Sequence, residues 1–185
     1  MIIALTGKLG SGKTTVANIF ESLGANIISA DKLGHELLTK ENIKKKLVEN
    51  FGEDILESNN INRKKLAEVV FNDLDNLKTL NSIIHPLLKR KILENIKPGL
   101  NIIDAALYYK LELETVSDKT ILVECTEDKV LKRLNDISLV SRRSFQKQIK
   151  NPDYIINNNN TPENTKEQVI KIWGKLNESS LSRNI

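Results

Sequence analysis

The sequence has few of the residues that mark several common classes of protein. It holds one cysteine, Cys125, so no disulfide can form within the chain, which agrees with a reducing compartment. Aromatic residues make up only 4%, and none stands in an RNA-stacking motif. No run of about 18 apolar residues occurs, so the sequence predicts no transmembrane helix. The first five residues lack a basic leader, and we expect no signal peptide and a cytoplasmic protein.

Charge adds a mild preference for anionic ligands. The net charge is +4, with 28% of residues charged. Such a balance attracts polyphosphates and nucleic acids alike, and it is equally compatible with a lysine-rich solvated surface. Because no nucleic-acid motif accompanies the charge, we expect small-molecule partners and no nucleic acid.

Five short apolar runs suggest the framework of the fold. They are nearly continuous rather than alternating, which is typical of strands buried on both faces of a parallel sheet. Helical patterns separate them, so the fold class is α/β with right-handed crossovers. The predicted strands are Ile2–Thr6, Asn26–Ala30, Asn101–Ala105, Thr120–Glu124 and Tyr154–Asn157.

A complete phosphate-binding motif follows the first predicted strand. Gly7 to Thr14 read G-x-x-x-x-G-K-[ST], the P-loop pattern, and a helix is expected from Lys13. Glycines let successive N–H groups turn inward around phosphates, and the helix N-terminus adds its dipole. Lys13 can reach the β- and γ-phosphates, while the Thr14 hydroxyl can bind Mg²⁺. The sequence therefore predicts a nucleoside triphosphate site.

Two carboxylates end predicted strands at the edge where open α/β sheets bind ligands. Asp31 can activate or orient a substrate hydroxyl group, or it can cap the following helix, and these roles are not exclusive. Asp104 can steady Mg²⁺, although an aspartate at a strand end is common. Three arginines of a later basic stretch can stabilise charge on a transferring phosphoryl group or simply face solvent. These are Arg133, Arg142 and Arg143.

Together these residues resemble the dephospho-coenzyme A kinase family, and the resemblance covers nearly the whole chain. It runs from Ile3-Ala4-Leu5-Thr6-Gly7 through Ser29-Ala30-Asp31 and later includes Lys132-Arg133-Leu134. Its most specific parts are Arg63 within Ile61 to Ala67, then Ile84-His85-Pro86, and Asp153 to Asn157 near the adenine site.

The resemblance implies a function and a division of the chain. The implied reaction transfers the γ-phosphate of ATP to the 3′-hydroxyl of the dephospho-coenzyme A ribose, with Mg²⁺ as cofactor. The implied fold is a three-layer P-loop fold with a five-stranded parallel sheet, in a monomer or small homo-oligomer. Its parts are a core (1–30, 98–132 and 151–178), a helical acceptor-binding insertion (31–97) and a helical lid (133–150).

Each site residue then receives an expected role. Lys13, Asp31 and Arg133 are the expected catalytic residues, and Asp31, Arg63 and His85 the acceptor-binding ones. Arg142 and Arg143 are lid candidates, and Thr14 and Asp104 the metal ligands. ATP is expected to contact Gly7, Leu9, Gly10, Ser11, Gly12, Lys13, Thr14, Thr15 and Asn157.

Two departures from the family leave alternatives open. Ala106 to Lys110 replace a segment that usually carries a proline and a glutamate, and Ile137 stands where a second lid arginine is frequent. Another small P-loop kinase acting on a nucleoside or nucleotide is the alternative enzyme. A non-catalytic nucleotide-binding regulator is the alternative from another class.

Overall fold

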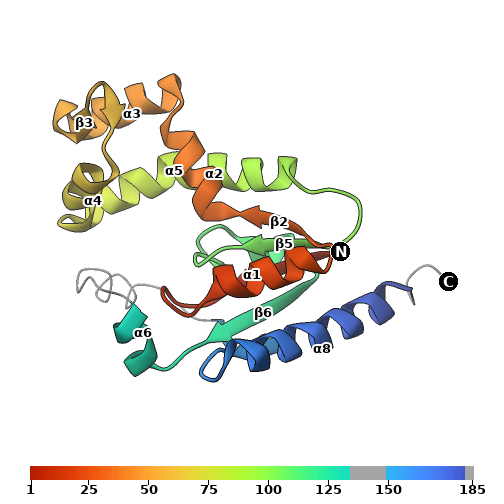
Figure 1. Cartoon of the computed structure of the whole chain (residues 1–185). Helices are drawn as coiled ribbons and strands as arrows, with labels where there is room; N and C mark the ends of the chain where they lie inside the picture. The colour runs from red at the N-terminus through yellow and green to blue at the C-terminus, as the bar shows by residue number, and fades with distance from the viewer. Residues whose placement is uncertain (134–148, 182–185) are drawn as a thin grey trace. The chain divides into compact units, whose positions relative to one another are not determined.

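The computed structural model describes residues 1–133 and 149–181, and the chain divides into two units. The sheet unit consists of Met1–Ser29 and Asn95–Ile185. The helical unit consists of the continuous segment Ala30–Glu94. Both are drawn in Figure 1. No helix among the described residues combines the length and apolarity needed to cross a bilayer.

Five parallel strands form the sheet, in the order β2-β5-β1-β6-β7. The α/β fold and the parallel sheet that the apolar runs predicted are confirmed. Two predicted ends move inward, because Ala30 begins a helix and Ala105 follows the last paired residue. The strands are β1 (Ile2–Thr6), β2 (Asn26–Ser29), β5 (Asn101–Asp104), β6 (Lys119–Glu124) and β7 (Tyr154–Asn157).

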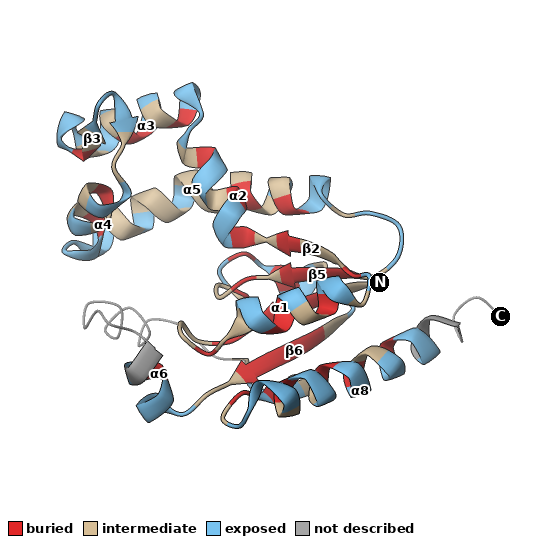
Figure 2. Cartoon of the chain, viewed as in Figure 1, coloured by how far each residue is buried: buried red, intermediate tan, exposed pale blue. Residues whose placement is uncertain are grey.

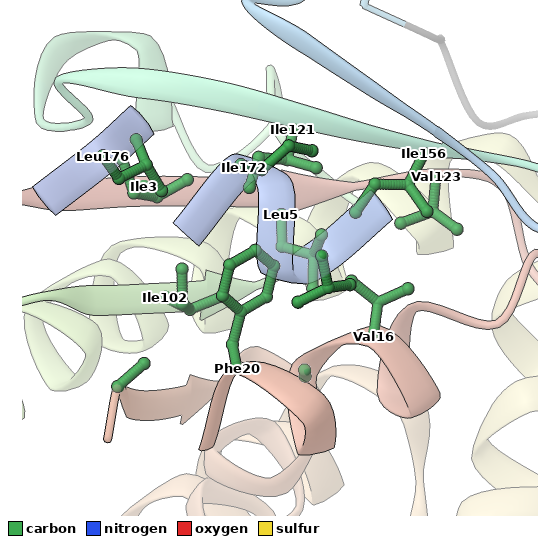
Figure 3. Packing of buried hydrophobic residues seen from close by; sticks show 13 residues of the cluster. Ile3, Leu5, Val16, Phe20, Ile102, Ile121, Val123, Ile156, Ile172 and Leu176 are labelled. Atoms are coloured by element: carbon green, nitrogen blue, oxygen red, sulfur yellow. The ribbon is translucent and has the colours of Figure 1, made fainter. Parts of the chain in front are cut away.

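The central strands β1, β5 and β6 are buried on both faces, as their continuous apolar runs predicted, whereas the edge strand β7 leaves Ile155 exposed. On one face, side chains of four strands pack against helices α1 (Lys13–Ser22) and α8 (Pro162–Leu181). Figure 3 shows Phe20 at the centre of this packing, and Figure 2 shows the buried strands. Burial of a side chain of this size contributes roughly 1.5–3 kcal/mol. The labelled members are Ile3, Leu5, Val16, Phe20, Ile102, Ile121, Val123, Ile156, Ile172 and Leu176.

The helices of the sheet unit begin and end at residues that favour the start and the end of a helix. Gly24 follows α1 with φ 102°, a left-handed conformation that favours glycine after a helix. At the start of α8, Thr161 Oγ1 accepts a hydrogen bond from Asn164 N at 3.3 Å, and Pro162 is the first helical residue. Trp173 packs on the core, its ring centroid 6.4 Å from that of Phe20. Trp173 is therefore a core residue.

The helical unit has a hydrophobic core of its own. Helix α5 (Leu74–Glu94) packs against the other three helices, α2 (Ala30–Leu38), α3 (Glu41–Phe51) and α4 (Arg63–Phe71). Asn62 caps α4 by accepting hydrogen bonds from Lys64 N and Lys65 N. The buried core residues are Ile43, Leu47, Ile55, Leu66 and Val70.

Three features of the helical unit differ from the sequence-based expectation. The sequence predicts one amphipathic segment from Asp31 to Asn50, whereas the structure has two helices, α2 and α3, divided at Thr39 and Lys40. The sequence also predicts that Pro86 interrupts the later segment Asp73–Lys97. Pro86 instead lies inside α5 without ending it, because proline removes one backbone donor while the turns on either side carry packed residues such as Leu88. A short hairpin of β3 (Leu56–Glu57) and β4 (Asn60–Ile61) was not predicted.

Three shorter elements complete the described chain. The 3₁₀ helix η1 (Glu53–Ile55) precedes β3, and η2 (Leu113–Thr115) precedes β6. Helix α6 (Glu127–Arg133) follows β6.

Candidate active site

The loop after β1 requires glycine at its first position. Gly7 has φ 154°, and a Cβ atom there would lie 2.4 Å from the Val123 carbonyl oxygen of β6. Any side chain would displace the backbone of a central strand. The sequence predicted glycines for a backbone turn, and at Gly7 the constraint is this close approach to β6.

The loop then leads into the N-terminus of α1. Gly12 occupies the N-cap position with φ 93° and ψ 24°, a left-handed conformation that suits glycine. Lys13 Nζ donates to the Gly7 carbonyl oxygen at 2.9 Å and to that of Lys8 at 3.4 Å. The lysine side chain therefore returns over the loop that precedes it. Its charge and the dipole of α1 both favour an anion at this place.

Ser11 provides a second indication that the loop binds a polar ligand. Its side chain is 1% exposed, and its Oγ atom has no hydrogen-bond partner among the described residues. A buried hydroxyl group without a partner is costly in a folded protein. Ser11 also lines a cavity of about 320 Å³ whose other lining residues include Lys8 and Asn159 but also the carboxylates of Glu124 and Glu127. The fit to an anionic ligand such as a nucleotide phosphate therefore rests on the loop, on Lys13 and on the dipole of α1.

A buried polar network holds the backbone of the P-loop. Asn158 Nδ2 donates to the Ser11 carbonyl oxygen at 2.8 Å, and Thr165 Oγ1 donates to Asn158 Oδ1 at 2.9 Å. Asn158 and Thr165 are both buried, with 7% and 0% of their surface exposed. The network links the P-loop to the start of α8, and so it fixes the loop's backbone.

Asn157, which was expected to contact ATP near the adenine, has a different environment from its neighbour Asn158. It is exposed at the end of β7, and its Oδ1 accepts a hydrogen bond from Asn159 N. Its backbone is held by Gln168 of α8, through Asn157 N and the Asn157 carbonyl oxygen. Asn158 rather than Asn157 contacts the P-loop.

Two oxygen-bearing residues of the sheet unit suit a magnesium ion. Thr14 is in the first turn of α1, and Asp104 is the last residue of β5, paired in register with Leu5 of β1. Mg²⁺ prefers a few protein oxygens completed by phosphates and water. No group of three or more His, Cys, Asp or Glu that could hold a metal occurs among the described residues. The donor set fits an ion brought in by a nucleotide.

Asp153 lies where strands β6 and β7 begin, at the end of the sheet opposite to the one that carries the P-loop. Its Oδ2 accepts hydrogen bonds from Thr120 N at 2.8 Å and Thr120 Oγ1 at 2.9 Å, and its Oδ1 pairs with Lys119 Nζ at 3.0 Å. Burial is the largest single influence on its pKa and raises it. The hydrogen bonds from Lys119 and Thr120 together outweigh burial and hold the pKa below its ordinary value. Asp153 therefore joins β6 to β7.

In the helical unit, Asp31 is the second residue of α2 and is exposed. It lies inside the first turn, so it does not occupy the N-cap position considered for it. A carboxylate in the first turn is favoured by the helix dipole. Its side chain is available to a ligand.

Arg63 and His85 lie on different helices of the same unit. Arg63 is the first residue of α4, and its Nη1 lies 2.5 Å from Nε2 of His35 in α2. His85 is a partly buried residue of α5, directly before Pro86. His35 was not singled out from the sequence, although its spacing of four residues from Asp31 places both on one side of α2.

The expected lid falls largely outside the described residues. Arg133 is the last residue of α6, and its side chain is not among those described. Arg142, Arg143 and Ile137 lie wholly outside the described residues.

The segment that departs from the family pattern is well packed. Tyr108, Leu111 and Leu113 are buried, and the rings of Tyr108 and Tyr109 meet edge to face with centroids 5.1 Å apart. Burial raises the pKa of the Tyr108 phenol, which therefore stays neutral. Apolar and aromatic packing anchors the segment, and Lys110 is exposed.

The parallel sheet and the loop of Gly7 to Thr14 define the class of the protein, which is the P-loop nucleotide-binding fold. Shikimate kinase from Aquifex aeolicus shares the fold, with a TM-score of 0.57 over 98% of this chain and 99% of that chain, at 18% identity.

The family follows from the sequence comparisons. The family model described as dephospho-CoA kinase matches residues 1–163. A dephospho-CoA kinase of Aquifex aeolicus is 36% identical over 190 residues, covering 94% of this chain and 96% of the relative. The structure of dephospho-CoA kinase from Campylobacter jejuni gives a TM-score of 0.71 at 25% identity, covering 97% and 98% of the two chains. The chain belongs to the dephospho-CoA kinase family, and it is an enzyme.

Proposed function

We propose that this chain transfers the γ-phosphoryl group of ATP to the 3′-hydroxyl of the dephospho-coenzyme A ribose, the last step of coenzyme A biosynthesis. The observation that carries the proposal is the extent of the family match. It covers residues 1–163, which include the whole P-loop and the whole helical unit. The resemblance therefore extends beyond the generic triphosphate loop to the part of the chain proposed to hold the acceptor.

The donor half of the proposed site belongs to the sheet unit. Backbone N–H groups of Gly7 to Thr14 surround the phosphates, and Lys13 adds positive charge at the β- and γ-phosphates. Ser11 Oγ, buried without a partner among the described residues, can donate to a phosphate oxygen. Leu9, Thr15 and Asn157 complete the proposed ATP contacts.

Thr14 and Asp104 are proposed to hold Mg²⁺, which would neutralise charge on the phosphates when bound. The Thr14 hydroxyl is in the first turn of α1, and the Asp104 carboxylate stands at the end of the strand beside β1.

The acceptor half is proposed to lie in the helical unit. The Asp31 carboxylate orients the acceptor hydroxyl and takes its proton as the oxygen bonds to the γ-phosphorus. The bond between that phosphorus and the bridging oxygen breaks, and ADP leaves. Arg63 contacts a phosphate of the acceptor, and His85 lines the same site.

Three arginines are proposed to stabilise the charge that develops on the transferring phosphoryl group. Arg133 at the end of α6 is the first of them, and Arg142 and Arg143 are the further lid candidates. An arginine that stabilises such charge can contribute roughly 10³–10⁵ in turnover.

We further propose a monomer or small homo-oligomer that acts in the cytoplasm without a nucleic-acid partner. A single cysteine and a nucleotide donor both agree with a reducing cytoplasm.

An acceptor panel tests the reaction. Purified protein is incubated with ATP and Mg²⁺ and with dephospho-coenzyme A, a nucleoside or a nucleoside monophosphate, and ADP release is measured. Dephospho-coenzyme A should raise ADP release well above the acceptor-free rate, and mass spectrometry should identify coenzyme A as the product. If only the nucleoside or nucleotide stimulated ADP release, the proposed acceptor would be wrong. If nothing stimulated release, a regulatory nucleotide-binding role would be favoured.

A further inference from the structure

His35 stands in a polar cluster of the helical unit that the steps above do not explain. Its Nε2 atom lies 2.5 Å from Arg63 Nη1. Both side chains line a cavity of about 290 Å³, here called the α2–α4 cavity, together with Thr39, Glu41, Lys44 and Asn60. Within the helical unit, His35 is the hydrogen-bond partner that the structure gives to the Arg63 guanidinium.

The chemistry of arginine fixes the direction of this hydrogen bond. A guanidinium group has only N–H donors, so Nε2 of His35 accepts. An accepting ring nitrogen carries no proton, so this contact uses the lone pair of His35 Nε2. The bond occupies one of the five N–H donors of Arg63 and leaves the others for a ligand.

Arg63 lies at a position where its positive charge does not stabilise its own helix. It is the first residue of α4, whose first turn contains no acidic residue, and the helix dipole opposes a cation there. Lys44, the other cation of the cavity, is already paired with Glu41 at 2.8 Å. Arg63 is thus the group of the cavity best suited to receive an anion.

The position of His35 relates this cavity to Asp31. The two residues are four apart on α2, and both are exposed, while Leu33 and Leu37 are buried. Residues at this spacing lie above one another on a helix, separated by about one turn, which rises about 5.4 Å. The 3′-hydroxyl and the 5′-diphosphate of the acceptor are substituents of one ribose, so a short separation between their binding groups suits them.

We infer that His35 is a positioning residue, which holds the Arg63 guanidinium in the α2–α4 cavity so that its remaining N–H groups receive the 5′-diphosphate of the acceptor. The inference rests on the proposed function, because it names the part of the acceptor that Arg63 binds. Neutral imidazole suits the task, since it can orient the guanidinium by accepting a hydrogen bond. Guanidinium groups bind phosphate oxygens in pairs only when their plane is correctly oriented.

Kinetics of two His35 variants test the inference. In His35→Gln the amide oxygen can still accept from Arg63, whereas in His35→Leu no acceptor remains. We expect His35→Leu to raise KM for dephospho-coenzyme A about tenfold, the cost of disturbing one charge-assisted hydrogen bond. KM for ATP and kcat should change less than about twofold, and His35→Gln should stay within about threefold of the wild type.

Two further variants make the result specific. Glu36→Gln, at the next exposed position of α2, should leave KM for the acceptor unchanged. In an Arg63→Leu background, His35→Leu should cause no further rise in KM, because both changes remove the same interaction. An equal rise in both backgrounds, or a His35→Gln variant as impaired as His35→Leu, would overturn the inference.

Failure of this inference differs from failure of the proposed function. If wild-type protein gave no ADP release with dephospho-coenzyme A, the proposed function itself would be wrong. If wild-type protein were active and His35→Leu kept its KM, only the role of His35 would be rejected. Retained KM for ATP and an unchanged circular dichroism spectrum identify a folded variant, and the His35→Gln comparison decides the matter where His35→Leu does not fold.

Discussion

At the scale of single residues, the polar groups of greatest interest have ordinary local reasons to be where they are. Asp31 is favoured by the dipole of α2, and Lys13 is held by two carbonyl oxygens of its own loop. Such contacts arrange a charged group before any ligand arrives, so less conformational freedom is lost on binding. The test for function is therefore whether removal of the group affects turnover more than stability.

Asp31→Asn gives the clearest residue-scale prediction. The amide keeps the size of the carboxylate but cannot take the proton of the acceptor hydroxyl, so kcat should fall by roughly 10²–10⁴. Affinity for ATP, measured by calorimetry, should change little because the P-loop belongs to the other unit. Asp54→Asn, an exposed change in η1, is the matched control and should leave kcat unchanged. A near-wild-type rate for Asp31→Asn would remove the proposed role of Asp31.

At the scale of elements, polar contacts that are buried or partly buried join segments that are distant in the sequence. Ser11 and Asn158 are 147 residues apart, and Thr120 and Asp153 are 33 apart. The first pair ties the P-loop to the turn before α8, and the second fixes the start of β7 beside β6. Each satisfies polar groups that would otherwise be costly to bury.

Thr165→Val tests the contact between the P-loop and α8. The substitution keeps the volume but leaves Asn158 Oδ1 without the donor that Thr165 provides, which should lower the free energy of unfolding by about 1–3 kcal/mol. ATP affinity should fall by roughly fivefold, because Asn158 then holds Ser11 less firmly. Thr115→Val, at an exposed threonine, should have little effect on either quantity. Urea unfolding and nucleotide titration provide the measurements, and no change in either would contradict the prediction.

Asp153 predicts a pH dependence whose sign follows from its lowered pKa. Because the folded-state pKa lies below the ordinary value of 3.8, the carboxylate stabilises the fold at neutral pH. That contribution is lost as the pH falls below 3.8 through the folded-state pKa. Asp153→Asn should therefore lower stability in urea at pH 7, and the deficit should shrink toward pH 3.

Asp75→Asn is the matched control for Asp153. The Asp75 carboxyl also has a lowered pKa, from its contact with Lys78, but it is fully exposed on α5. Surface pairs of this kind contribute little to stability. An equal loss in both variants at pH 7 would show that Asp153 does not join the strands as described.

At the scale of the whole molecule, each of the two units has a hydrophobic core of its own among the described residues, and each core is a source of stability. The sheet unit has its core between the sheet and helices α1 and α8, and the helical unit has a separate core around α3 and α4. A ligand stabilises only the unit that it binds in the folded state. The two substrates should therefore affect heat unfolding differently.

Calorimetry with ATP and Mg²⁺ tests this division. ATP at 100 times its Kd should stabilise the sheet unit by about 2.7 kcal/mol, and the corresponding transition should move to higher temperature. In Lys13→Ala the shift should be much smaller, because the charge at the phosphates is lost. An undiminished shift in that variant would place the nucleotide away from the P-loop.

The sequence allowed the sheet to be predicted more fully than the helical unit. Continuous apolar runs and one P-loop identify the central strands, because few folds other than a parallel α/β sheet combine these two features. The β3–β4 hairpin escaped prediction because strands of two residues have no periodicity to read. Its turn relies on Ser58 and Asn59 with φ of 47° and 60°.

Site contacts that depend on tertiary structure could not be predicted. The run Asn157 to Asn160 gave no sign that Asn158 would be buried, because its partners, Ser11 and Thr165, meet it only in the folded chain. The contact between His35 and Arg63 joins residues 28 apart on two helices. Its one sequence signal was the spacing between Asp31 and His35.

The strand order has a consequence for how the chain folds during its synthesis. β1 and β2 are made first, but they are not neighbours, because β5 lies between them. The partners of both strands therefore leave the ribosome only after residue 100. The helical unit, Ala30–Glu94, is complete before then and makes its contacts within one continuous segment. We expect the inserted unit to become ordered on the ribosome ahead of the sheet into which it is inserted.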